Sequence, residues 1–384
     1  MDLRTRLKAL QEVKKESFST LNIPIQAKVP EVVTGKVIPS ELQDWEQIGT
    51  FTFRKVQHLP FSSGAVVKKW IDLACNSFGE KDVRTLYWFD TETTGLSGGA
   101  GTVVFLFGGL RLHAEGYSIE QYFLSDFPGE EEFLHTLEKH VPFTEDTVFI
   151  SYNGSAYDTP LLKTRFLLQR MSPPSIRQLD LLYLVRRLYK KILPDCSLHT
   201  VEQALLHKVR ALDIPGWRVP LVYFQFLREG QAKELPLIFY HNQEDLLSLL
   251  SLFAYLGRIL EHPWEEDKVD PEGLALFLLT KNPSVGLDFL KSLSLKGNCW
   301  AVTELSKMYR REGKIQESRQ IRYPFIYNSF SLAVEELKYL EHKEKDYSSA
   351  IELATYWMSK DLSPLDKAEL EIRLNRLKRK AKIC

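Results

Sequence analysis

Cysteine is scarce in this sequence of 384 residues, which has only Cys75, Cys196, Cys299 and Cys384. None of the four belongs to a Cys-x-x-Cys pair, and their wide spacing argues against a zinc cluster and against a disulfide framework. The chain also lacks a net charge, because 50 Lys and Arg residues balance 50 Asp and Glu residues. No overall field attracts it to a polyanion, so any contact with nucleic acid must come from local patches.

Long apolar runs are absent as well. No stretch approaches the length of a membrane span, and charges are scattered through residues 1–15 where a signal peptide would have an apolar core. We therefore expect no membrane partner and a location in a reducing cytoplasm. The remaining composition, with 26% charged and 44% hydrophobic residues, is that of an ordinary globular protein long enough for two or three domains.

The pattern along the chain predicts three regions. Residues 1–80 form an N-terminal extension that is partly irregular, with a short helix at 3–15. Residues 81–257 form the main domain, with strands at 86–90, 102–107 or 102–112, 117–124 and 147–151. A helix is predicted at 130–140, and the pattern is mostly helical after 159. Adjacent strands followed by helix and strand indicate an α/β fold with a mixed sheet flanked by helices.

Residues 258–384 are expected to form an all-α domain. Two turn-then-helix segments begin at Gly313 and Glu344, about 31 residues apart, which is near the tetratricopeptide period of ~34 residues. A plain helical domain explains the same pattern equally well. The tail from Arg373 to Lys382 is rich in Lys and Arg, which usually marks a solvated helix end and less often a nucleic-acid contact.

The most informative motif is Asp90-Thr91-Glu92, which ends the apolar run 86–89. Residues two apart on a strand point to the same face, so Asp90 and Glu92 present two carboxylates side by side. Their mutual repulsion favours a cation between them, and a hard divalent ion such as Mg²⁺ prefers oxygen ligands. A solvated strand end is the common alternative for an isolated Asp-x-Glu.

Two later motifs add polar groups. Asn153, Tyr157 and Asp158 follow the buried strand at 147–151, and Asp158 is expected in the first turn of a helix, where acidic residues are common in any case. His241 and Asp245 lie four residues apart on a predicted helix and so share one face. An imidazole one turn before a carboxylate suits a base beside a metal ligand, although a surface pair has the same spacing.

Together, the order and spacing of these three motifs resemble the ribonuclease-H-like 3′–5′ exonuclease superfamily, whose members carry an Asp-Glu-Asp-Asp set. The chain is most similar to the bacterial YprB-type branch, a ribonuclease-H-like domain joined to tetratricopeptide-like helices. The phrases that carry the resemblance are residues 89–102, 152–162 and 179–188, and it covers about 85–255.

The resemblance implies a divalent-metal-dependent nuclease, a 3′–5′ exonuclease with a two-metal mechanism. Asp90, Glu92, Asp158 and Asp245 would hold two divalent cations, Mg²⁺ or Mn²⁺, and all four would be catalytic together with His241. The substrate would be nucleic acid, single-stranded or at a 3′ end, with DNA and RNA both open. The C-terminal helices would hold the substrate or a protein partner.

The chain departs from the superfamily at the base. The superfamily usually has a Tyr four residues, or a His five residues, before the last Asp, whereas here His241 is four before Asp245 and Tyr240 is five before. Adjacent helix positions are about 100° apart, so only one of the two faces the site. We favour His241, since imidazole titrates near neutral pH.

Further candidates rest on weaker patterns. Asn153 and Tyr157 are candidate contacts to the nucleic-acid end, and Arg186 and Arg187 belong to a basic cluster that would follow a phosphate backbone or form a solvated helix face. Asp180 is either a support for the metal ligands or a helix N-terminal acid. Two other functions stay open: a scaffold of little or no catalytic activity, and a structure-specific endonuclease with the same metal chemistry.

Overall fold

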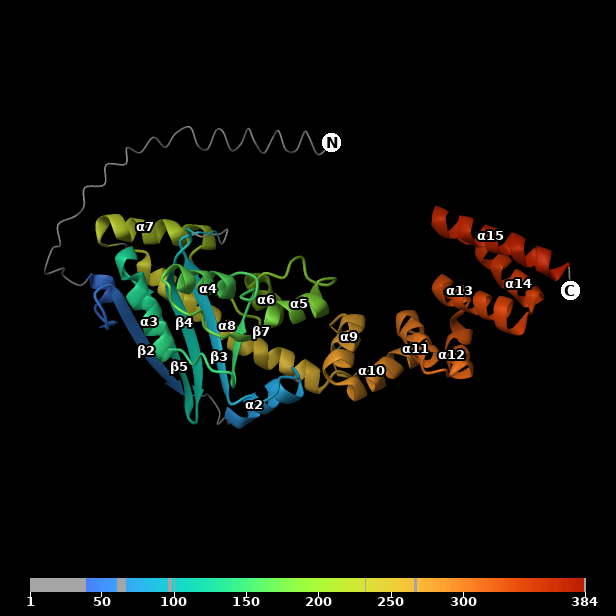
Figure 1. Cartoon of the computed structure of the whole chain (residues 1–384), viewed down its shortest axis with the longest axis horizontal. Coiled ribbons are helices and arrows are strands. Elements are labelled where there is room, and N and C mark those ends of the chain that lie inside the picture. Colours follow the sequence, from blue (N-terminus) through green and yellow to red (C-terminus); the bar gives the residue numbers. More distant parts are fainter. Residues whose placement is uncertain are drawn as a thin grey trace, which may run out of the picture. The chain divides into compact units, whose positions relative to one another are not determined.

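The computed structural model describes residues 39–60, 67–95, 99, 101–231, 233–265 and 268–382, without the side chains of 67 and 68 (Figure 1). The helix expected at 3–15 lies outside the described residues. No helix in the described part of the chain combines the length and the apolar character needed to cross a membrane.

The centre of the fold is a mixed sheet of seven strands in the order β1-β2-β5-β4-β3-β6-β7. The strands are β1 (Glu46–Gln47), β2 (Thr52–Pro60), β3 (Thr85–Thr93), β4 (Val104–His113), β5 (Gly116–Leu124), β6 (Thr147–Ser151) and β7 (Arg177–Asp180). Neighbouring strands from β1 to β3 are antiparallel, whereas β6 runs parallel to β3 and β7 parallel to β6. This confirms the predicted α/β fold with a mixed sheet.

The helices are α2 (Val67–Asn76), α3 (Glu130–His140), α4 (Asp158–Leu168), α5 (Leu181–Tyr189), α6 (Leu198–Leu205), α7 (Val219–Glu229), α8 (Leu235–Glu261), α9 (Pro271–Lys281), α10 (Pro283–Leu295), α11 (Cys299–Arg311), α12 (Ile315–Arg322), α13 (Phe330–Tyr339), α14 (Tyr347–Met358) and α15 (Pro364–Ala381). Short 3₁₀ turns lie at Ser40–Leu42, Phe127–Gly129, Gly216–Arg218 and Tyr323–Phe325, and a π-helical turn at Leu340–Glu344.

Alternation along the strands divides the interior into two apolar cores, one on each face of the sheet. On β3, Leu86 and Trp88 belong to one core, whereas Tyr87 and Phe89 belong to the other. Successive side chains of a strand point to opposite faces, so this division follows directly from the sequence 86–89. Helices α2, α5 and α9–α11 contribute to the first core, and α3, α4 and α7 to the second.

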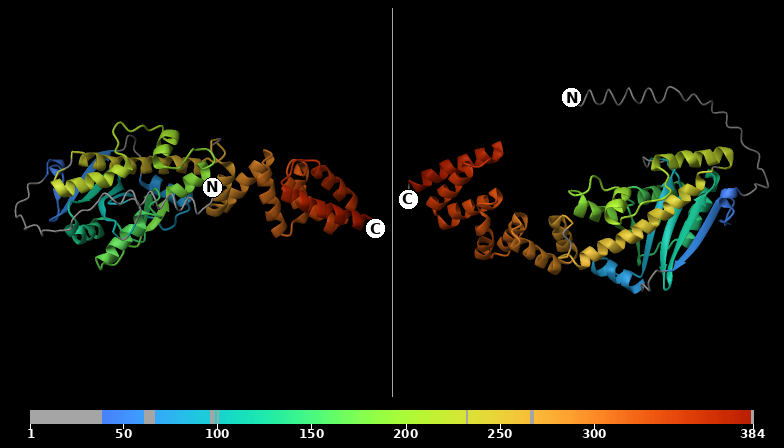
Figure 2. Two further views of the ribbon diagram at one scale, coloured as in Figure 1. Left: turned by 90° about the horizontal axis from the view of Figure 1, so that it is seen from above. Right: turned by 180° about the vertical axis from the view of Figure 1, so that it is seen from behind.

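Helix α8 is the element that both cores share. In the ribbon views it runs across the strands of the sheet (Figure 1, Figure 2). Its first turns, with Leu235 and Phe239, pack in the second core, and its residues from Leu246 onward pack in the first. Between these parts, α8 passes over β4 at Gly108, where an added Cβ would lie 2.1 Å from Asn242 Oδ1. Only glycine permits this close approach.

The predicted boundary between the N-terminal extension and the main domain, at residue 81, differs from the structure. Strand β2 pairs with β5 over its whole length, from Thr52 opposite Leu124 to Pro60 opposite Gly116. The sheet therefore begins well before residue 81. The sequence of β2 gives little sign of this, because polar and apolar residues do not alternate along it.

The second predicted boundary, after residue 257, also falls inside a structural unit. Helix α8 continues to Glu261, and the first core extends through α9 and α10 to Leu305 of α11. A separate core begins at Ile326 and holds α13, α14 and α15 together. The tetratricopeptide assignment of these helices stays a prediction.

The basic tail at the C-terminus has a structural partner. Arg373, Arg376 and Lys380 of α15 all bind the carboxylate of Glu341, at 3.0, 2.7 and 2.9 Å, and the side chain of Glu341 is fully buried. Burial opposes ionisation, but hydrogen bonds from Arg376 and Lys380 outweigh it and lower the pKa of Glu341 to about 2. Half of the tail's charge therefore stabilises the last core.

Replacing Glu341 with Gln should lower the stability of the C-terminal helices by ~2 kcal/mol, because three cations lose one shared acceptor. The stabilisation is present above the ordinary Glu pKa of 4.5 and is lost as the pH falls toward about 2. Thermal unfolding at pH 7 and pH 3 measures this effect. Glu369→Gln, on the exposed side of α15, is the control and should change neither curve. Equal unfolding of the two variants at pH 7 would contradict the assignment.

Candidate metal centre

The motif at the end of β3 contributes two carboxylates to one face of the sheet. Asp90 and Glu92 continue the alternation of Leu86 and Trp88, and both keep part of their surface exposed. Asp90 lies opposite Gly108 of β4, the point where α8 crosses. The missing Cβ at Gly108 therefore allows α8 to approach the carboxylate of Asp90.

Asp158 begins α4, directly after the loop that follows β6. It is buried, and its carboxylate accepts a hydrogen bond from the hydroxyl of Thr91, the central residue of the β3 motif. Because β3 and β6 are parallel neighbours, the residues that follow them meet at the same edge of the sheet. This explains why residues 67 positions apart come together.

The loop before Asp158 is held by Asp180 at the end of β7. The carboxylate of Asp180 accepts hydrogen bonds from the backbone N–H groups of Asn153 at 2.8 Å and Ser155 at 3.0 Å. It also caps α5 by accepting from the N–H of Leu182 at 3.1 Å. Asp180 is thus the N-terminal acid of α5 and also holds the loop that leads to Asp158; its support of a metal ligand stays a prediction.

Helix α8 brings three polar residues to this edge. His241 Nε2 lies 3.7 Å from Asp245 Oδ2, one helical turn away. Asn242 is fully buried, donates to Asp90 Oδ2 at 3.0 Å, and accepts from Gln121 at 2.9 Å. Asn242 thus ties the helix that carries Asp245 to the strand that carries Asp90.

His241 and Tyr240 face different surroundings. His241 interacts with Asp245 and Glu92, whereas the hydroxyl of Tyr240 bonds with Glu244. Burial opposes the charged imidazole, but Asp245 and Glu92 outweigh it and raise the pKa of His241. The side chain that faces the carboxylates is therefore His241.

Burial and electrostatic repulsion shift the pKa values of the four carboxyl groups. Burial, together with repulsion from Asp245, Glu92 and Asp158, raises the pKa of Asp90 well above its usual range. Burial likewise raises the pKa of Glu92 to about 8 and that of Asp158 to about 6. Burial also raises the pKa of Asp245, although His241 and Arg210 counteract it. Simultaneous ionisation of all four carboxylates is therefore unfavourable in the absence of a cation.

A guanidinium also reaches the cluster. The guanidinium of Arg210, which is nearly buried, donates to Asp245 Oδ1 and to Glu202 Oε1, the latter at 2.6 Å. Asp213, three residues later, accepts from His241 Nδ1 at 2.5 Å and leaves the other ring nitrogen, Nε2, on the side of Asp245. Arg210 and Asp213 lie between α6 and α7, where the sequence has no periodic pattern that would point to them.

The donor set suits a hard divalent cation, because clustered carboxylates are oxygen ligands whose repulsion such an ion removes. Among the described residues, no three His, Cys, Asp or Glu side chains form a preassembled metal site. Asp90, Asp158 and Asp245 are instead bonded to Asn242, Thr91 and Arg210. Binding of a cation would therefore require these side chains to reorient toward it.

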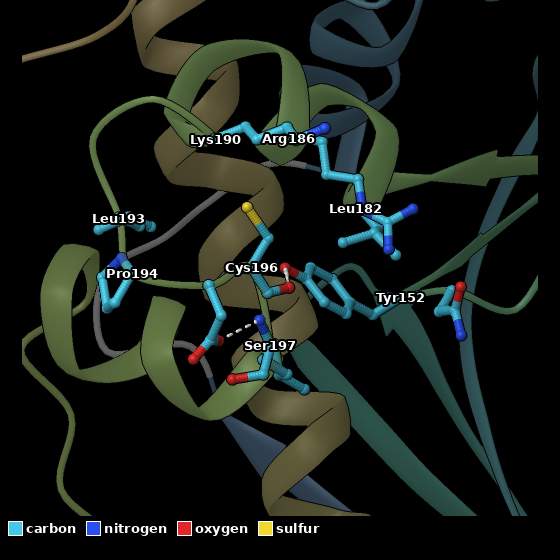
Figure 3. Close-up of a pocket in the computed structure, with 11 residues that line it drawn as sticks. Tyr152, Leu182, Arg186, Lys190, Leu193, Pro194, Cys196 and Ser197 are labelled. Atoms are coloured by element: carbon cyan, nitrogen blue, oxygen red, sulfur yellow. Dashed lines mark hydrogen bonds between the residues drawn. The ribbon is translucent and has the colours of Figure 1, made fainter. Parts of the chain in front are cut away.

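The remaining predicted contacts lie around this edge in different roles. The hydroxyl of Tyr157 donates to the carbonyl of Gly95 and lies 3.0 Å from the hydroxyl of Thr93. Tyr157 therefore joins the loop before α4 to the end of β3. Asn153, with a left-handed φ of 64°, and Arg186 line a neighbouring cleft (Figure 3). Arg187 is exposed on α5 and does not line that cleft.

Comparison with known proteins gives a consistent result. The sequence profile of the RNase_H superfamily matches residues 87–257. The uncharacterized protein YprB of Bacillus subtilis (strain 168) is 32% identical over 313 residues, which are 77% of this chain and 75% of that protein.

Solved structures resemble the chain at lower identity. The family B DNA polymerase of Pyrobaculum calidifontis is 15% identical, with a TM-score of 0.35 over 51% of this chain and 28% of the polymerase. Exonuclease I of E. coli, in complex with a dT13 oligonucleotide, is 16% identical, with a TM-score of 0.26 over 41% of this chain and 43% of the exonuclease. The chain thus spans less than half of either protein.

The raised carboxyl pKa values predict how metal-free stability changes with pH. Glu92 ionises at its ordinary pKa of 4.5 when unfolded but at about 8 when folded, so the native state binds more protons between these values. Stability should therefore fall by ~2 kcal/mol as the pH rises from 5 to 8.5. Urea unfolding in the presence of a chelator measures it. A Glu92→Gln variant should show a smaller fall, and an equal fall in both proteins would contradict the assignment.

Proposed function

Because the chain belongs to the RNase_H superfamily, in the branch that includes YprB of Bacillus subtilis, we propose that it is a nuclease that hydrolyses phosphodiester bonds with two divalent cations, Mg²⁺ or Mn²⁺. We further propose that it removes nucleotides from a 3′ end. The observation that carries the proposal is the group of four interacting carboxylates, Asp90, Glu92, Asp158 and Asp245, at one edge of the sheet. A module that only binds nucleic acid would have no need of four carboxylates around one site.

The four carboxylates are the proposed cation ligands. Divalent cations, when bound, supply activation of water and stabilisation of the leaving oxygen. The chain's own contribution is position: Asn242 orients Asp90, Thr91 orients Asp158, and Arg210 orients Asp245. Asp180 holds the loop that leads to Asp158.

His241 is the proposed general base. Asp213 accepts from its Nδ1 and thereby keeps Nε2 available on the side of the carboxylates. A ring nitrogen held in this way can accept a proton from the attacking water and later release it to solvent. Tyr240, bonded to Glu244, would have no part in the chemistry.

Two other functions use the same observations. An endonuclease would need the same metal chemistry, and a scaffold would use the fold for binding alone. The C-terminal helices from α11 onward would then hold the substrate or a protein partner, and we place the protein in the cytoplasm under each of these proposals. Cleavage from a 3′ end, cleavage at internal positions and absence of cleavage distinguish the exonuclease, the endonuclease and the scaffold.

The first experiment is cleavage of end-labelled single-stranded DNA and RNA with Mg²⁺ or Mn²⁺, beside Asp90→Asn. We expect stepwise shortening from the 3′ end by the parent and a loss of roughly a thousandfold in the variant, since one ligand oxygen becomes a neutral amide. Mn²⁺ should raise the melting temperature of the parent and not that of the variant. Internal cuts would indicate the endonuclease, and no metal-dependent cleavage of either polymer would indicate the scaffold.

The proposed base predicts a different result from the proposed ligands. His241→Ala should slow cleavage by about 10²- to 10⁴-fold while Mn²⁺ still raises the melting temperature. Tyr240→Phe, at the adjacent position, should cleave at the parent rate. A rate unchanged by His241→Ala, or a loss confined to Tyr240→Phe, would exclude His241 as the base.

A further inference from the structure

The cleft beside the candidate metal centre is built differently from the centre itself. It has a volume of about 630 Å³ and lies beyond the ends of β6 and β7. One wall is a face of α5, and the opposite wall is the segment 193–198 that leads into α6 (Figure 3). Such a volume is typical of small-molecule sites.

The positive charge of this cleft comes from one stripe of α5. Leu182, Arg186 and Lys190 are spaced four residues apart, so they share a helix face, and all three line the cleft. The side chains of Arg186 and Lys190 form no ion pair or hydrogen bond with another residue in the described part of the chain. Two exposed cations thus point into a cavity without a protein acceptor.

Neighbouring cations of the same run are used elsewhere. Lys191 forms ion pairs with Asp270 at 2.8 Å and Glu272 at 3.3 Å, which join α5 to the start of α9. The only acid that lines the cleft among the described residues is Asp195, and it accepts from the N–H of Ser197 and the hydroxyl of Thr200. The cleft therefore keeps a net positive charge.

The rest of the lining is apolar and aromatic. The ring of Tyr152 lies between the two walls, and its hydroxyl donates to the carbonyl of Cys196 at 2.7 Å (Figure 3). Leu182, Leu193 and Pro194 complete the apolar surface. Cations for phosphate beside an aromatic ring and aliphatic side chains are the combination that binds an unpaired nucleotide.

One loop of the chain connects the cleft with the candidate metal centre. Tyr152 and Asn153 line it, and the same loop ends at Tyr157 and Asp158. Asp180 holds this loop by bonds to Asn153 and Ser155. A strand whose scissile phosphate lies at the carboxylates can therefore extend along the loop into the cleft.

We propose that the cleft between α5 and residues 193–198 is a subsite for a single-stranded nucleic acid, where Arg186 and Lys190 bind backbone phosphates of nucleotides away from the scissile bond. This inference rests on the proposed nuclease function and deepens it, because it assigns an unpaired strand as the substrate. An unpaired strand is required since the apolar walls accept a base only when it is unstacked.

The test compares Arg186→Gln/Lys190→Gln with a control, Arg228→Gln/Lys296→Gln, which removes two exposed charges outside the cleft. Glutamine keeps most of each apolar stem, so the folds should melt like the parent. For a 12-nucleotide single strand, KM should rise about tenfold in the cleft variant with little change in kcat. Binding of the same strand is measured by fluorescence anisotropy without metal at several salt concentrations. The slope of log K against log[salt] should be less steep by ~1.4 in the cleft variant, the value for two phosphate contacts.

A dinucleotide without a terminal phosphate is the second substrate, because its single phosphate is the scissile one and no further phosphate is left for Arg186 and Lys190. Its kcat/KM should be equal in the parent and both variants. A cleft variant that matches the parent on the 12-nucleotide strand would overturn the subsite and leave the nuclease intact. An equal loss on the dinucleotide would also overturn it, since the two residues would then act at the metal centre.

A measurement of binding without cleavage tests the subsite independently of the nuclease proposal. If the parent binds the single strand but cleaves nothing, the nuclease proposal fails, and the salt slopes alone decide the subsite. A parent that neither binds nor cleaves single strands would overturn both. Equal salt slopes of the cleft variant and the parent would overturn the subsite in every case.

Discussion

Mutual repulsion among four carboxylates is the constraint on which the arrangement of this protein depends. Asp90 and Glu92 meet Asp158 and Asp245 at one sheet edge, where burial and the neighbouring carboxylates together raise their pKa values. Without a bound cation, the fold limits this cost locally through neutral donors and one guanidinium. Arg210 also binds Glu202, so a single cation serves two acids and only partly offsets the cost of ionising the cluster.

The packing of helix α8 in the domain positions the residues that face the carboxylates. Its ends lie in the two opposite cores, and its middle passes over Gly108, where a larger residue would displace Asn242. The residues that face the carboxylates are therefore placed by burial at both ends of the helix rather than by contacts among themselves. A site fixed in this way can exchange ligands without loss of the fold, since its stability resides elsewhere.

Much of the fold could be predicted because its signal is local. The helix at 130–140 and the strand at 147–151 have the predicted bounds, and the alternation of 86–89 places Asp90 and Glu92 correctly on one face. Strand β7 has only four residues and no alternation, so it gives no such signal. Arg210 and Asp213 depend on contacts across more than 25 residues. The sequence does give a signal for Asn242, because this polar residue lies in the buried helix stripe between Ile238 and Leu246.

Runs of basic residues show why composition alone does not identify a binding surface. Lys191 joins two helices by ion pairs, and Arg376 with Lys380 stabilises the last core through Glu341. Arg186, in the same run as Lys191, instead faces an open cleft. A charge that already has a buried or well-placed acceptor gains little from a phosphate, whereas one without an acceptor gains most of the attraction. The supply of nearby carboxylates, rather than the number of cations, therefore determines where this protein can bind a polyanion.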